Sequence, residues 1–265
     1  MGNLSAPGFI DLPPRTAKPR SRGLTHVLDK GLTLPDASAH VEAAAPYIDI
    51  WKLGWGTAYL DPAVCDKVNL LATHAILACV GGTLLEIAWA QGKAAECLAW
   101  AADAGFPAVE VSNGVVGMPP LEKRRLIAAA AERFTVLAEV GDKDPHAPVS
   151  PARWSHEMLS DLEAGATWVI AEGRESGTVG LYGPDGAVRE PLFEALVDAV
   201  GVASLIFEAP RKDQQAWFIR TLGSNVSLGN VVPGDILGLE ALRLGLRADT
   251  AMLNLADLDS AASAP

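Results

Sequence analysis

The spacing of the apolar segments constrains this chain more than any other feature. Eight runs rich in apolar and β-branched residues start roughly 25 to 35 residues apart, the length of one strand, one helix and two loops. They are residues 24–28, 48–54, 74–80, 108–111, 134–140, 167–172, 203–208 and 225–231. Each run is apolar nearly throughout instead of alternating, which is typical of parallel strands buried on both faces.

Helical patterns fill the intervals between these runs. One of them opens with Ser150 and Pro151, a cap and a first helical residue, and stops at Gly165. Eight strand–helix alternations in 265 residues predict an α/β fold, a single (β/α)₈ barrel of the TIM type. A doubly wound open sheet is the alternative, but it usually has a glycine-rich phosphate loop after its first strand, which residues 28–35 (LDKGLTLP) do not match.

The barrel is expected to span residues 23–252. Residues 1–22 are basic and proline-rich and predict a flexible, loosely attached arm, and residues 253–265 predict a C-terminal tail. The net charge of −11 argues against a nucleic-acid partner. No apolar run approaches ~18 residues, so no membrane association is expected. The three cysteines form no CxxC pair and no secretory leader is visible, which favours a cytoplasmic location.

Three of the predicted strands end in a glutamate at matching places. These are Glu139, Glu172 and Glu208, in the stretches LAEVG, IAEGR and IFEAP. Because the active site of such a barrel lies at the carboxyl ends of the strands, the three carboxylates should converge there. Converging carboxylates repel one another unless a cation intervenes, and oxygen ligands favour Mg²⁺. The alternative is a closed ring of salt bridges to Lys52, Arg174 and Arg211.

Basic side chains gather at the same strand ends although the whole chain is acidic. They are Lys30, Lys52, Lys143, Arg174 and Arg211, and the polar residues Asp29 and Asn230 also lie at strand ends. Arginine suits a planar carboxylate or phosphate, whereas lysine supplies a point charge or a proton. The pattern therefore predicts a small substrate that carries several negative charges.

Seven stretches, in order along residues 23–250, together resemble the phosphosulfolactate synthase family. They are GLTHVLDKG, YIDIWKLGWGTA, GGTLLE, LAEVGDK, VIAEGRESGTVGLY, IFEAPRKDQQAWFI and GLEALRLGLRADT. The resemblance implies a homo-oligomeric (β/α)₈ enzyme that uses Mg²⁺ to add sulfite to C3 of phosphoenolpyruvate and protonates C2. The product would be (2R)-phospho-3-sulfolactate, which in methanogens leads to coenzyme M.

The resemblance also assigns roles to the polar residues at the strand ends. Mg²⁺ would be held by Glu139, Glu172 and Glu208, with Glu139 also counted among the catalytic residues. The substrates phosphoenolpyruvate and sulfite would be bound by Lys52, Arg174, Arg211, Asn230 and Asp29. The general acid for C2 would be Lys143, with Lys30 as its rival.

The chain departs from the family pattern after the fourth predicted strand. The family usually has Asp-Gly and a small hydroxyl residue there, whereas this chain has Asn113, Gly114 and Val115. One alternative is therefore another nucleophile acting on phosphoenolpyruvate. A second is a stress-associated barrel protein without activity. A third is an isomerase or aldolase for sugar phosphates, in which Lys52 would form a Schiff base.

Overall fold

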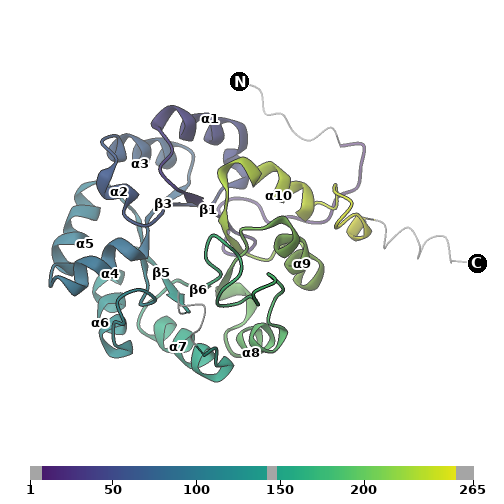
Figure 1. Cartoon of the computed structure of the whole chain (residues 1–265). Helices are drawn as coiled ribbons and strands as arrows, with labels where there is room; N and C mark the ends of the chain where they lie inside the picture. Colours follow the sequence, from purple (N-terminus) through teal and green to yellow (C-terminus); the bar gives the residue numbers. More distant parts are fainter. Residues whose placement is uncertain (1–7, 142–147, 255–265) are drawn as a thin grey trace, which may run out of the picture.

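Eight parallel strands close into a barrel, in the order of the sequence (Figure 1). A computed structural model describes residues 8–141 and 148–254 of the chain. The strands are β1 (Thr25–Asp29), β2 (Ile50–Leu53), β3 (Leu77–Val80), β4 (Ala108–Val111), β5 (Thr135–Val140), β6 (Trp168–Ala171), β7 (Leu205–Glu208) and β8 (Leu228–Val231). β1 pairs with both β2 and β8, with Val27 opposite Val231, so the predicted barrel is confirmed and the open sheet is excluded.

Ten helices form a ring around these strands within the described residues (Figure 1). They are α1 (Leu34–Ala44), α2 (Thr57–Leu60), α3 (Val64–Thr73), α4 (Gly82–Ala90), α5 (Ala94–Asp103), α6 (Pro120–Ala131), α7 (Pro151–Glu163), α8 (Glu190–Val200), α9 (Lys212–Leu222) and α10 (Ile236–Arg243). The predicted start of α7 is confirmed, because the Ser150 hydroxyl accepts a hydrogen bond from the Arg153 amide. None of the described helices combines the length and apolarity that crossing a bilayer requires.

The interior of the barrel has an apolar floor and a charged upper layer. The floor is a cluster of Leu24, Ile50, Cys79, Ala108, Leu137, Ile170 and Ile206. Side chains alternate across a strand, so the residue two positions beyond a floor residue points to the same side. In β2 that residue is Lys52, in β4, β5 and β7 it is Glu110, Glu139 and Glu208, and directly after β6 it is Glu172. The strand period alone therefore brings one lysine and four glutamates to one level above the floor.

The segment before β1 lies against the amino-terminal end of the barrel, away from the charged layer. Arg15 forms an ion pair with Glu240 at 2.9 Å and donates to Asn225, which precedes β8. Arg20 pairs with Asp49, which precedes β2, at 3.1 Å. Within residues 8–22, the described part of the arm, Arg15 and Arg20 thus meet buried acceptors that the sequence pattern does not reveal.

Arg15→Ala should destabilise the fold, because Arg243, at 4.0 Å, would be the one ion-pair partner left to Glu240 among residues 8–141 and 148–254. We expect the free energy of unfolding, measured by urea denaturation, to fall by about 2 kcal/mol. Arg22→Ala is the matched control, since Arg22 lies in the same arm but is exposed; it should change stability by less than about 0.5 kcal/mol. Equal losses in the two variants would contradict the anchoring role of Arg15.

Candidate active site

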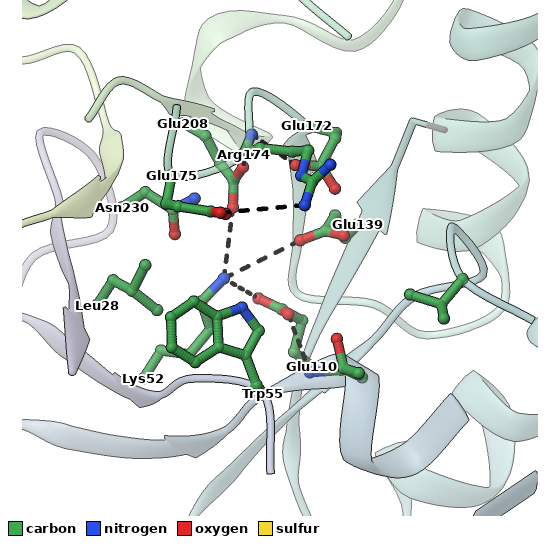
Figure 2. A pocket seen from close by; sticks show the side chains of 13 residues that line it. Leu28, Lys52, Trp55, Glu110, Glu139, Glu172, Arg174, Glu175, Glu208 and Asn230 are labelled. Atoms are coloured by element: carbon green, nitrogen blue, oxygen red, sulfur yellow. Dashed lines mark hydrogen bonds and ion pairs between the residues drawn. The ribbon is translucent and has the colours of Figure 1, made fainter. Parts of the chain in front are cut away.

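A pocket of about 190 Å³ opens at the carboxyl ends of the strands, above the charged layer (Figure 2). It is lined by Leu28, Lys52, Trp55, Gly82, Thr83, Glu110, Val115, Glu139, Glu172, Arg174, Glu175, Glu208 and Asn230. Most of this lining is charged or polar, and the volume suits a small molecule. The pocket lies where an active site was predicted from the barrel topology.

Lys52 lies at the bottom of the pocket, among carboxylates from three other strands (Figure 2). Its Nζ lies 2.8 Å from Glu110 Oε2, 3.3 Å from Glu208 Oε1 and 4.0 Å from Glu139 Oε2. Burial acts to lower the pKa of Lys52, but the three carboxylates outweigh it and raise that pKa well above its ordinary value of 10.5. Lys52 is therefore a permanent cation at neutral pH and a poor nucleophile.

The three glutamates with matching positions do converge, as predicted. One carboxylate oxygen from each of Glu139, Glu172 and Glu208 lies within 4.8 Å of the other two, and all three side chains are buried. Burial of several like charges at this spacing is unfavourable without a cation. Hard oxygen donors in this arrangement fit a divalent ion such as Mg²⁺. The donor set of the described residues thus suits the metal that the family resemblance implies.

The turn after β6 fixes two of these carboxylates through backbone amides. Gly173 N and Arg174 N both donate to Glu208 Oε2 at 2.9 Å, and Arg174 N also lies 2.6 Å from Glu172 Oε1. Arg174 has a φ of +56°, a conformation that non-glycine residues rarely adopt. This backbone conformation directs one amide at both carboxylates, so the orientation of the glutamates depends on the loop that carries Arg174.

Glu110 belongs to the site, although the sequence analysis assigned it no role there. It makes the shortest contact with Lys52, and its other oxygen accepts a hydrogen bond from Gly82 N at 3.0 Å, at the start of α4. Burial raises the pKa of Glu110, whereas Lys52 opposes the shift. The signal was available, because Glu110 stands two residues after the floor residue Ala108, as Glu139 does after Leu137.

Glu86 is a second residue whose role the sequence did not predict. It is fully buried on α4 and accepts hydrogen bonds from the amides of Val115 and Val116, at 2.8 and 3.1 Å, and from the Ser112 hydroxyl. These bonds hold the loop after β4, which places Val115 at the pocket wall. Asn113 lines no part of this pocket and donates instead to Glu157 on α7 at 3.2 Å.

Arg174 and Asn230 line the pocket, as predicted for residues that bind substrate. The Arg174 side chain is about two-fifths exposed at the rim, 3.9 Å from Glu175 (Figure 2). Asn230 has a φ of +54°, and its buried Oδ1 atom has no hydrogen-bond partner among the described residues. A polar atom in that position can bond to a guest in the pocket.

Two other residues predicted to bind substrate, Asp29 and Arg211, do not line the pocket. Asp29 follows Leu28, which does line it, so its side chain points outward; it accepts hydrogen bonds from Trp51 Nε1, Gly31 N and Leu32 N. Arg211 directly precedes α9 and pairs with Asp213 at 3.1 Å.

Lys30 is exposed beyond β1. Lys143, the predicted general acid, lies outside the described residues. The alternative, a ring of salt bridges, is present in part. Lys52 pairs with Glu110 and Glu208, whereas Arg211 pairs with Asp213 and is not part of the ring.

Sequence comparison agrees with this geometry. The model of the (2R)-phospho-3-sulfolactate synthase (ComA) family matches residues 13–249. The phosphosulfolactate synthase of Methanothermobacter thermautotrophicus is 42% identical over 244 residues, 90% of this chain and 95% of its own. The phosphosulfolactate synthase of Bacillus subtilis is 39% identical over 247 residues, 92% of this chain and 98% of its own.

Solved structures support the fold only. A 3-hexulose-6-phosphate synthase superposes with a TM-score of 0.51 at 15% identity, over 90% of this chain and 99% of its own. The YdjI aldolase of Escherichia coli K12 superposes with a TM-score of 0.54 at 13% identity, over 90% of this chain and 91% of its own. Because the family match covers nearly the whole barrel, the chain belongs to the (2R)-phospho-3-sulfolactate synthase family of enzymes.

Proposed function

We propose that this enzyme adds sulfite to C3 of phosphoenolpyruvate in a Mg²⁺-dependent reaction, with protonation at C2. One observation carries the proposal: the buried triad of Glu139, Glu172 and Glu208 shares a small pocket with the cations Lys52 and Arg174. Such a pocket can neutralise a metal and a polyanionic substrate at the same time. Bound by the three glutamates, Mg²⁺ would accept the negative charge that develops on the substrate carboxylate.

The cations of the pocket would bring two anions together. Phosphoenolpyruvate and sulfite repel each other, so their encounter needs positive charge on both sides of the reacting atoms. Lys52 supplies a fixed positive charge at the bottom of the pocket, and Arg174 supplies a planar guanidinium at its rim. Asn230 offers an amide to the same space. Arg211, at the start of α9, would have to leave Asp213 to reach a substrate.

Lys52 is a weak acid because its carboxylate partners stabilise its charged form, so we assign the proton for C2 to another group. Lys143 is the proposed donor because it occupies the matching position of the family motif, and Lys30 at the end of β1 is its rival. The intact triad disfavours the alternative of a barrel without activity. Another nucleophile on phosphoenolpyruvate remains an alternative, since Val115 forms part of the pocket wall.

The reaction itself is testable with purified protein. Incubation with phosphoenolpyruvate, sulfite and Mg²⁺ should yield a product with the summed mass of the two substrates, detected by liquid chromatography and mass spectrometry. Excess EDTA should abolish product formation because the triad would lose its metal. Unreacted substrates under all Mg²⁺ conditions would contradict the proposal, and replacement of sulfite by other nucleophiles in parallel reactions would test the alternative.

Glu172→Gln should weaken the metal site, since it removes one of three negative charges. We expect Mn²⁺, a paramagnetic substitute for Mg²⁺, to bind more than about tenfold less tightly, as measured by electron paramagnetic resonance. The matched control is Glu175→Gln, because Glu175 also lines the pocket but lies outside the triad. Equal weakening by both substitutions would mean that the pocket attracts cations only by its overall charge.

Treatment with pyruvate and borohydride should leave the mass of the protein unchanged. A Schiff base requires an uncharged amine, and the raised pKa of Lys52 keeps it protonated. A stable adduct that maps to Lys52 by peptide mass spectrometry would instead support the aldolase alternative. An aldolase that forms a Schiff base through an active-site lysine, treated in parallel, controls for the trapping chemistry.

A further inference from the structure

The loop between β6 and α8 brings Arg174 to the pocket, and it is fastened by residues that lie outside the pocket. The loop crosses the end of β7, where Gly173 N and Arg174 N meet Glu208. Its far part folds back on itself, with Leu181 N donating to Glu172 O at 2.9 Å and an isolated bridge between Tyr182 and Val188. Loops of this length keep one conformation only when specific contacts hold them.

Gln214, on α9, makes the first of these contacts. Its Nε2 donates to Gly177 O at 2.7 Å and to Gly186 O at 3.1 Å, so one amide group joins two distant points of the loop. Its Oε1 accepts from Arg211 N at 3.3 Å at the start of α9. The side chain is almost completely buried. Glutamate could not donate these bonds, and asparagine is one methylene shorter.

Tyr182 makes the second contact from within the loop. Its ring is fully buried, and its hydroxyl donates to the backbone oxygen of Glu208, the last residue of β7. Gly173 permits the close approach, because a Cβ there would lie 2.6 Å from Tyr182 Cε2.

We propose that Gln214 and Tyr182 are positioning residues that hold the Arg174 guanidinium over the pocket for the anionic substrate. The two contacts hold the loop to two neighbouring elements: Tyr182 fixes it to the strand that carries Glu208, and Gln214 fixes it to the helix that follows that strand. Without these contacts the loop would no longer hold Arg174 in position over the pocket. This proposal rests on the proposed function for the identity of the anion, but the fastening of the loop stands independently of it.

Gln214→Met tests the proposal, since methionine fills a similar volume without the hydrogen bonds. Hydrogen–deuterium exchange, followed by mass spectrometry, should quicken for peptides that cover residues 173–189. Gln215→Met is the matched control, because Gln215 is equally buried and adjacent, but its side chain bonds to Ala209 O outside this loop. We expect the control to leave loop exchange unchanged. Unaltered loop exchange in Gln214→Met would overturn the proposal, whether or not the enzyme uses sulfite.

Steady-state kinetics then distinguish a role of these residues in positioning Arg174 from a role in the overall stability of the fold. Gln214→Met and Tyr182→Phe should each raise the KM for phosphoenolpyruvate roughly tenfold and lower kcat less, because Arg174 acts on substrate binding. In an Arg174→Ala background, Gln214→Met should add little further change, since the residue that it positions is already absent. Fully additive effects would overturn the positioning role. A wild-type enzyme that is inactive towards phosphoenolpyruvate would contradict the proposed function, while the exchange measurement would still test the loop.

Discussion

The buried ammonium of Lys52, shared among Glu110, Glu139 and Glu208, is the interaction on which the mouth of this barrel depends. Four buried carboxylates at one level would repel one another and resist folding, and one lysine offsets only part of that charge. The remainder suits the site for a divalent ion. Assembly of the barrel therefore brings a fixed cation and the carboxylates of the proposed metal site together before any substrate arrives.

The amino-terminal end of the barrel holds contacts that stabilise the fold, whereas the carboxyl-terminal end holds the charged pocket. At the amino-terminal end, the guanidinium of Arg243 is fully buried and donates to Ser224 O, Leu24 O and Val226 O, beside the arm fastened by Arg15. Arg243 has little access to water, and this burial lowers its pKa to about 9. The amino-terminal end is therefore held by buried polar groups. The apolar floor divides it from the charged layer. The carboxyl-terminal end can thus hold unfavourable charge that the rest of the fold supports.

Much of this organisation could be predicted from the sequence, because it follows from strand periodicity. Seven of the eight apolar runs contain a whole strand, the first overlaps β1 in all but its last residue, and the three matching glutamates meet as expected. Asp29 shows the limit: a polar residue at the end of a strand faces the pocket only if it shares the side of the inward residues, and Leu28 holds that side. Gln214 and Tyr182 were beyond prediction because their partners are backbone atoms distant in sequence.

The most direct test of the charged mouth is a crystal soaked in Mn²⁺, with diffraction recorded at the manganese absorption edge. We expect an anomalous peak within coordination distance of one carboxylate oxygen each from Glu139, Glu172 and Glu208, above the Lys52 ammonium. A fully occupied peak elsewhere in the pocket, or no peak at saturating Mn²⁺ with Glu139 and Glu208 still beside Lys52, would contradict a metal role for these glutamates.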